Sequence, residues 1–256
     1  MSLALKLLNP KQFQKIRESI QEVIYVEDAA RLFSVYFENS LKMATECLRS
    51  ISHNDGSFDA DIKKIDGFSG NVFRIMCELV KPKEPWSVIC HGDCWSNNFL
   101  FRYSQPRQVE EVRLLDLQVG RYASPATDIL HFLYTSTQAG MRKRHYDHLL
   151  RVYHSTLNDT VRRLMAGSPY ENTEVFMPFQ QLQDELEKHR VYGFLNALWL
   201  LPAVHADADN LPDLETITED DLFSQETLDN FVSHQTPTYR QSIRDLVHEY
   251  RAHGYV

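Results

Sequence analysis

Residues 86–117 restrict the fold of this chain most, because they hold its clearest β-structure. Three short apolar runs, Ser87–Cys90, Asn98–Tyr103 and Val112–Leu117, have the length and the β-branched or aromatic content of strands. The last two flank a polar connection, Ser104–Glu111, which suits a hairpin loop. A chain of 256 residues with so little strand must build its core mainly from helices.

Helical periodicity fills the chain on both sides of this block. Apolar residues recur at three- and four-residue steps from Asp28 to Ile51, and the pattern resumes after the Ser124-Pro125 pair and continues to Leu164. Asn9-Pro10 is typical of a helix start. Further helices are predicted over about Asn9–Val23, Asp59–Val80, Phe179–Leu186, Val191–Leu201 and Thr238–His253. The fold class is therefore α+β and mostly helical.

Composition excludes several classes of function. The chain has 27 Lys and Arg against 35 Asp and Glu, a formal net charge of −8, so nucleic acid is not an expected partner. Its longest nearly apolar stretch, Tyr192–Val204, is shorter than the ~18–20 residues that span a bilayer, and its N-terminus lacks a secretion-signal pattern. We expect a soluble, cytoplasmic protein without a membrane partner. The acidic stretch Asp207–Asp221 fits a solvated loop better than a binding tail.

Cysteine and glycine usage excludes two further kinds of site. The four cysteines, at positions 47, 77, 90 and 94, fit small buried side chains better than a disulfide set. Cys90-His91-x-x-Cys94 lacks the further ligands of a closed zinc site. The 9 glycines assemble neither G-x-G-x-x-G nor G-x-x-x-x-G-K-[ST], so a nucleotide site here would lack the usual glycine cradle.

The most informative stretch is H-G-D-C-W-S-N-N at 91–98, followed by L-L-D-L-Q at 114–118. Phosphoryl transfer needs a carboxylate that orients the attacking hydroxyl and accepts its proton, together with oxygen ligands for Mg²⁺. Asp93 fits the first role, and Asn98 with Asp116 fits the second. The five positions from Asp93 to Asn98 match the spacing of kinase catalytic loops.

Each of these residues also has an ordinary structural interpretation. His91 fits a core histidine, Asp93 and Asn98 fit turn formers, and Asp116 fits a cap at a strand end. The combination H-G-D-x-x-x-x-N, however, is expected by chance only about 0.001 times in a chain of this composition. We therefore favour the catalytic interpretation of the set.

Three neighbouring residues are candidates with two interpretations each. Asp128, in the first turn of an apolar helix, can favour the helix dipole at the surface or turn inward to accept hydrogen bonds from the loop backbone or His91. We expect the inward position. Trp95 is either a packing anchor or part of a substrate wall, and Gln118 either assists near the metal or is an ordinary polar residue at a strand end.

Three segments of the chain resemble the ecdysteroid kinase-like, or CHK kinase-like, family, which is related to choline kinase and aminoglycoside phosphotransferases. They are V-I-C-H-G-D-x-W-x-N-N-x-L-F over 88–101, L-D-x-Q-x-x-R-Y-x-S-P-x-x-D over 115–128 and Y-D-x-L-L-x-x-Y over 146–153. The resemblance implies a protein-kinase-like fold, ATP and Mg²⁺ as cofactors, and phosphorylation of a small-molecule hydroxyl, with ecdysteroid as the namesake substrate.

Carried over by position, Asp93 resembles the family's base, Asn98 and Asp116 its metal ligands, and Asp128, with His91, the support of the catalytic loop. Cys94 and Leu117 stand where the family more often has Leu and Phe. On this resemblance the chain is a single C-terminal lobe over 1–256. Its parts are leading helices over 1–85, the catalytic loop, hairpin and metal loop over 86–128, and a helical substrate-side region over 129–256.

The chain departs from the family ahead of His91. Family members carry an N-terminal lobe with a phosphate-covering loop, a strand Lys that holds the phosphates and a helix Glu that pairs with it. Nothing upstream of His91 resembles a five-stranded sheet, and Lys6, Lys11 and Lys15 lie on predicted helices. We expect the chain to begin after that lobe, to have no appreciable kinase activity alone, and to expose an apolar surface that favours self-association or a covering partner.

Three functions are therefore compared. The leading hypothesis is an ATP-dependent small-molecule phosphotransferase, and the runner-up is an inactive, truncated lobe that acts as a binding or regulatory protein. A metal-dependent hydrolase that uses Asp93 and Asp116 is the weakest, because no further His or carboxylate cluster completes a two-metal site.

Overall fold

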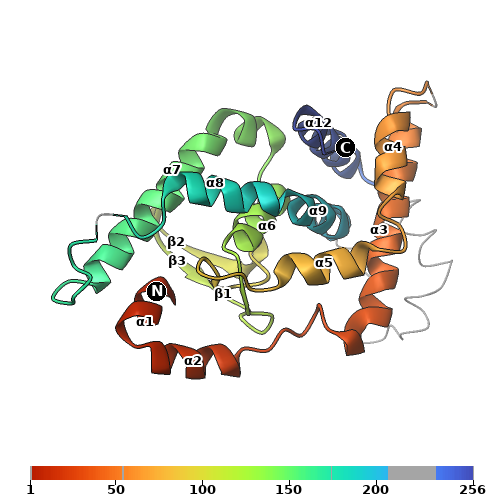
Figure 1. The fold of residues 1–256 in the computed structure, drawn as a ribbon. Helices are drawn as coiled ribbons and strands as arrows, with labels where there is room; N and C mark the ends of the chain where they lie inside the picture. The colour runs from red at the N-terminus through yellow and green to blue at the C-terminus, as the bar shows by residue number, and fades with distance from the viewer. Residues whose placement is uncertain (1, 54, 174, 207–234, 256) are drawn as a thin grey trace. The chain divides into compact units, whose positions relative to one another are not determined.

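The computed structural model describes residues 2–53, 55–173, 175–206 and 235–255 (Figure 1). The predicted acidic stretch Asp207–Asp221 lies outside them. The chain divides into two compact units, Met1–Ile24 with Glu78–Arg190 and Tyr25–Cys77 with Val191–Val256. The single domain predicted over 1–256 stays a prediction.

The described residues are mostly helical, with two small antiparallel sheets, which confirms the predicted fold class. The first unit contains α1 (Ser2–Leu8), α2 (Pro10–Ser19), β1 (Val88–Cys90), the short 3-10 helix η2 (Ser96–Asn98), β2 (Phe99–Gln105), β3 (Gln108–Leu114), β4 (Arg121–Ala123), α6 (Ala126–Ser136), α7 (Ala139–Leu164) and α8 (Phe179–Lys188). The second contains η1 (Glu27–Ala29), α3 (Ala30–Ile51), α4 (Asp59–Asp66), most of α5 (Val72–Val80), nearly all of α9 (Arg190–Val204) and α12 (Pro237–Ala252).

The helices begin close to the predicted residues, but one helix ends earlier than predicted and another is divided into two. The Asn9 side chain accepts a hydrogen bond from the Gln12 N–H at 3.1 Å and so caps α2, but this helix ends at Ser19 rather than near Val23. The prediction of a single helix over Asp59–Val80 is wrong, because the structure has two helices, α4 and α5, in this range. Gly70 lies between them with a φ of +73°, a left-handed conformation that interrupts a right-handed helix.

The β-hairpin is longer than predicted. Its strands run to Gln105 and from Gln108, so the loop expected over Ser104–Glu111 is reduced to Pro106-Arg107. Charged residues extend the strands because they pair across the solvent-exposed sheet, with Arg102 Nη1 3.1 Å from Glu111 Oε2. The run predicted to continue to Leu117 ends as a strand at Leu114. Strand β4 and helix α1 were not predicted.

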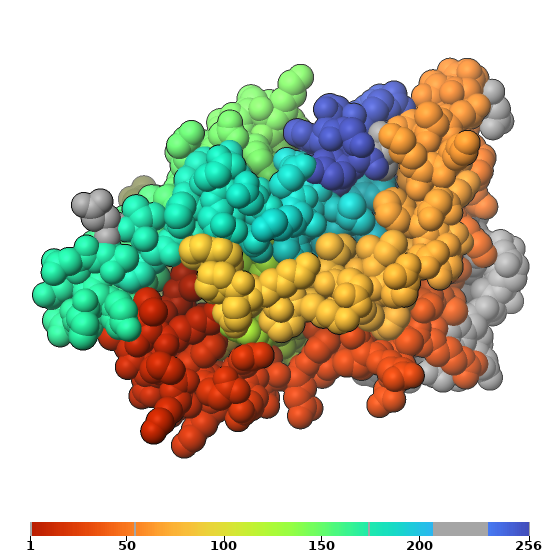
Figure 2. Space-filling view, in the orientation of Figure 1, coloured from red at the N-terminus to blue at the C-terminus, as the bar shows by residue number. Residues whose placement is uncertain are grey.

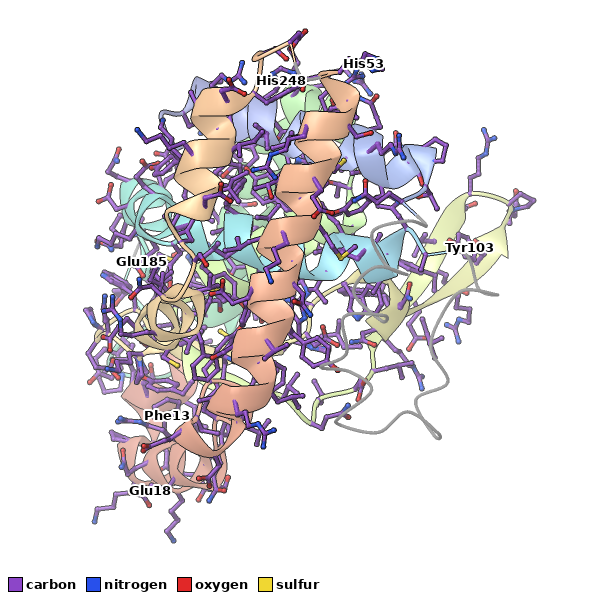
Figure 3. The ribbon with its side chains drawn as sticks, turned by 90° about the vertical axis from the view of Figure 1, so that its right-hand side faces the viewer. Phe13, Glu18, His53, Tyr103, Glu185 and His248 are labelled. Atoms are coloured by element: carbon purple, nitrogen blue, oxygen red, sulfur yellow. The ribbon has the colours of Figure 1, made fainter. Side chains whose placement is uncertain are left out.

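Within the first unit, the N-terminal helices pack against the later segments through small apolar side chains. Leu3 and Ala4 of α1 form a buried cluster with Val161 and Met165. Figure 2 shows the red surface of these helices in direct contact with the green-to-teal surface beyond α7. The ring of Phe13 on α2, labelled in Figure 3, lies edge-on to that of Tyr122 on β4, and the two ring centroids are 5.7 Å apart. The start of the chain therefore supports the strand pair beneath the candidate site.

The second unit has its own core. The α3 and α9 helices meet through Phe37 and Trp199, whose ring centroids are 5.2 Å apart. Asp61 on α4 is buried and paired with the guanidinium of Arg251 on α12, where Nε lies 3.0 Å from Oδ1. No helix in the described ranges is long and apolar enough to cross a membrane.

Candidate functional site

A two-stranded sheet holds the loop that carries the predicted base. Strands β1 and β4 pair antiparallel, with Cys90 opposite Arg121 and Val88 opposite Ala123. The loop 91–98 begins where β1 ends, and α6 begins three residues after β4 ends. The intervening turn is fixed by the hydroxyl of Ser124, which donates to the buried Glu185 carboxylate on α8 at 2.7 Å.

Asp128, in the first turn of α6, holds the backbone at the start of this loop. Its Oδ2 accepts the His91 N–H at 2.6 Å, and its Oδ1 accepts the Gly92 N–H at 3.0 Å. Burial raises the pKa of Asp128, while the two N–H donors and the nearby Arg121 oppose that shift. The carboxylate is thus turned inward and uses both oxygens on the loop.

Gly92 brings the loop against the segment that carries Asp116. It has a φ of +88°, and a Cβ at this position would lie 2.0 Å from the carbonyl oxygen of Val119. No side chain fits that space, so only glycine allows the two backbones to approach this closely.

His91 and Asn98 fix the residue before Asp116. His91 Nε2 lies 2.7 Å from the Leu115 carbonyl oxygen, and His91 Nδ1 accepts the Asp93 N–H at 3.3 Å. These contacts suit the ring tautomer with its proton on Nε2. The Leu115 N–H donates to the Asn98 carbonyl at 2.9 Å. Asp116 follows with a φ of +65°, a left-handed conformation that Asp adopts more readily than most residues, and its side chain is exposed.

The side chains of Asp93 and Asn98 are in direct contact. Asn98 Nδ2 donates to Asp93 Oδ2 at 2.8 Å and to the Asp93 carbonyl at 2.9 Å. Asn98 is buried, whereas the Asp93 side chain is 30% exposed. Asp93 therefore combines a fixed orientation with access from solvent.

Trp95 contacts this centre through its backbone, because its N–H donates to the Asp93 carbonyl at 3.2 Å and its carbonyl accepts the Asn98 N–H at 3.0 Å. Trp95 is half-buried, and its indole nitrogen is buried without a hydrogen-bond partner among the described residues. Gln118 is exposed. Burial, together with the charges of Asp128 and Asp93, raises the pKa of the Cys94 thiol to about 12, so this thiol stays neutral.

The donor set fits a hard cation such as Mg²⁺. The nitrogen of the Asn98 amide is committed to Asp93, which leaves its oxygen as the ligating atom, and Asp116 offers an exposed carboxylate on the adjoining segment. Within the described ranges no group of three or more His, Cys, Asp or Glu side chains could hold a metal ion by itself. Other ligands would have to come from phosphate oxygens or water.

Sequence reasoning missed His131 as a site residue. His131 Nε2 lies 3.6 Å from Asp93 Oδ1, and the histidine is almost fully buried. It follows Asp128 by three positions, which places both on one face of α6. That spacing is the signal in the sequence that could have identified it.

The first three lysines ahead of β1, Lys6, Lys11 and Lys15, lie on helices rather than on a strand. All described elements before β1 are helical. Lys6 Nζ donates to the Glu84 carboxylate at 2.9 Å and to the Ser87 carbonyl at 2.5 Å, so it fastens α1 to the approach to β1. Lys11 and Lys15 are exposed.

Comparison with protein-family models matches residues 1–166 to the ecdysteroid kinase-like family. The match covers more than half of the chain and includes the loop at 91–98, Asp116 and Asp128. Neither the curated proteins nor the solved structures yielded a match. The mostly helical fold with its small hairpin agrees with a kinase-like lobe. The chain belongs to the ecdysteroid kinase-like family.

Proposed function

We propose that this chain provides the catalytic and metal-binding residues of an ATP-dependent phosphotransferase that phosphorylates a hydroxyl group of a small molecule, such as an ecdysteroid or another small alcohol. Membership of the family indicates kinase-like phosphotransferase activity in general. The observation that carries the finer proposal is the contact between Asn98 Nδ2 and Asp93 Oδ2 at 2.8 Å, five positions apart on a loop that Asp128 holds.

Asp93 is the proposed base. Its carboxylate is oriented by Asn98 through one oxygen and is partly open to solvent, so a substrate hydroxyl can reach it. It would accept the hydroxyl proton as the oxygen attacks the γ-phosphorus of ATP and the bond to the β-phosphate oxygen breaks. The other residues of the loop keep this carboxylate in place during the transfer.

The metal role is assigned to Asn98 and Asp116, whose oxygens would hold Mg²⁺ and so help to neutralise phosphate charge. The backbone contacts from Leu115 to His91 and Asn98 support this assignment, because they tie the two ligand-bearing segments together. In this proposal His91 and Asp128 support the loop, Trp95 would form part of the substrate wall, and Gln118 would assist near the metal.

A second candidate function is a binding or regulatory role without turnover. It is favoured by the helical nature of all described elements before β1 and by the engagement of Lys6 with Glu84 and backbone carbonyls. One face of the β2–β3 hairpin is also apolar and about half exposed at Phe101 and Val112. Such a face suits a covering partner or self-association.

The proposed base is tested by Asp93→Asn in a protein that includes a complete ATP lobe. We expect transfer of the γ-phosphate to an ecdysteroid to fall at least ~10²-fold, because the amide cannot accept the hydroxyl proton. Asp147→Asn, which changes an exposed carboxylate on α7, is the matched control and should leave transfer unchanged. Thermal unfolding of both variants checks the fold. Turnover of Asp93→Asn within a few-fold of the wild type would remove Asp93 from the base role.

A further inference from the structure

The imidazole of His131 is buried beside the Asp93 carboxylate without a hydrogen bond of its own. Its side chain is 3% exposed, and neither ring nitrogen has a hydrogen-bond partner among the described residues. A buried polar group left unpaired costs about 1–3 kcal/mol, and an apolar side chain of similar shape would avoid that cost. The position of this histidine therefore calls for an explanation other than packing.

Helix α6 directs two side chains at the same loop. Asp128 and His131 are three residues apart and so lie on one face of the helix. Asp128 binds the backbone N–H groups of His91 and Gly92, and His131 approaches the side chain of the next residue, Asp93. One rigid element thus faces both the backbone and the reactive group of the loop.

The two oxygens of Asp93 have different neighbours. Oδ2 accepts the Asn98 amide at 2.8 Å, and Oδ1 lies 3.6 Å from His131 Nε2. A closure of about 0.5 Å would turn the second approach into a hydrogen bond, and catalytic hydrogen bonds are commonly long before substrate binds. A carboxylate can accept about four hydrogen bonds, so lone pairs remain for the substrate hydroxyl.

The electrostatics around His131 favour a neutral donor. Burial, followed by the charge of Arg121, lowers the pKa of His131 to about 3, so the ring is neutral at physiological pH. A neutral ring has one N–H, and a proton on Nε2 can be donated to the facing carboxylate, whereas a bare Nε2 would repel it. A neutral donor orients a base without the added positive charge that would weaken its basicity.

We propose that His131 is a positioning residue, which donates from Nε2 to Oδ1 of Asp93 and holds the proposed base toward the acceptor hydroxyl. This inference rests on the proposed phosphotransferase function for its catalytic consequence. The juxtaposition of the two side chains can be tested without turnover.

The kinetic test compares His131→Phe and His131→Gln in a protein with a complete ATP lobe, with ATP and an ecdysteroid as substrates. Phe fills the space without a donor, and we expect kcat to fall about 10-fold while KM for ATP stays within about 2-fold. Gln offers an N–H near the position of Nε2 and should restore kcat to within about 3-fold of the wild type. Equal kcat for the wild type and His131→Phe, or an equal loss in both variants, would overturn the proposal.

His189→Phe is the matched control for the loss of a buried histidine. His189 is also 3% exposed, but its Nδ1 contacts the Glu185 carbonyl at 2.7 Å rather than the candidate site. This variant should lose stability and keep the kcat of its folded fraction. A similar fall in kcat for His189→Phe would assign the effect of His131→Phe to general destabilisation and refute a positioning role.

The second test uses nuclear magnetic resonance of the 256-residue chain with ¹⁵N-labelled histidine. We expect the His131 ring to show the neutral tautomer protonated on Nε2, with a proton signal that shifts in Asp93→Ala and stays in place in Asp147→Ala. Protonation on Nδ1 instead, or a ring proton signal that does not shift in Asp93→Ala, would overturn the inference. If the wild-type protein transfers no phosphate to any alcohol, the proposed function is refuted. The spectroscopic result would still show whether His131 donates to Asp93.

Discussion

Two backbone conformations at single residues place the candidate base and metal ligand. Gly92 approaches the Val119 carbonyl so closely that a Cβ would lie 2.0 Å from its oxygen. Asp116 has a φ of +65°, an uncommon conformation outside glycine that is found more often at functional sites. Neither residue could be exchanged for a β-branched one without moving the loop or the segment beside it.

The pKa of His131 predicts how stability depends on pH. The folded value of about 3 lies below the usual value near 6.5, so between these limits the unfolded chain binds a proton that the folded chain does not. The free energy of unfolding should therefore fall as pH decreases through this window. His131 should account for a loss of about 1–2 kcal/mol between pH 6.5 and pH 5. Urea unfolding of the wild type and of His131→Phe at both pH values measures it, and an equal pH dependence in the two proteins would contradict the prediction.

At the level of elements, α6 and the β1–β4 pair carry the site. Besides Asp128 and His131, α6 provides the Ser136 hydroxyl, whose oxygen accepts the Ser96 N–H at 2.8 Å. The loop 91–98 is therefore attached to this helix near both of its ends. The β2–β3 hairpin, by contrast, contacts its surroundings mainly near its base, where the rings of Phe99 and Phe132 lie 5.5 Å apart, while Tyr103 further along β2 is about half exposed (Figure 3).

Glycine substitutions in and beside the hairpin turn should change the stability of the hairpin in opposite directions. Arg107 has a φ of +67° after Pro106, a combination typical of a type II turn, which favours glycine at the second central position. Arg107→Gly should raise the free energy of hairpin opening by a few tenths to about 1 kcal/mol. Gln105→Gly, within β2, should lower it. Amide hydrogen exchange of the hairpin measures both, and a loss of protection in Arg107→Gly would contradict the assigned turn.

At the scale of the whole molecule, every candidate catalytic and metal-binding residue belongs to the first unit. The loop 91–98, Asp116, Asp128 and His131 all lie between Glu78 and Arg190. The second unit contributes its own core and the Asp61–Arg251 ion pair. Substitutions in that unit are therefore expected to lower the stability of the protein rather than to change its catalytic residues.

The 256-residue chain by itself should transfer phosphate far more slowly than an ordinary enzyme, whatever sequence accompanies it in the cell. Phosphoryl transfer depends on phosphates held in line with the acceptor in a closed site, and no described element before β1 is a strand that could cover them. Purified chain, Mg-ATP and an ecdysteroid provide the assay. A rate on the order of 1 s⁻¹ or more would show that the chain closes its own site.

Local patterns were sufficient to predict most of the helices and the candidate centre. The period of apolar residues over Asp28–Ile51 and the capping pair Asn9-Pro10 act within one helical turn, so neighbours in sequence decide them. The spacing from Asp93 to Asn98 likewise lies within one loop, and the structure brings those two side chains together. The charged hairpin was harder to predict, because its strands are stabilised by pairing across the sheet rather than by an apolar pattern.

The sequence by itself determined the fold class, the family and the identity of the residues around Asp93, because these depend on short-range spacing and residue chemistry. Only the tertiary structure decided that β1 pairs with β4, that Gly92 must fit against Val119, and that His131 faces Asp93. Each of these contacts joins positions more than 20 residues apart, so it exists only after the intervening chain has closed a loop and packed. The physical reason is that burial and contact distance belong to the folded molecule, whereas spacing belongs to the chain.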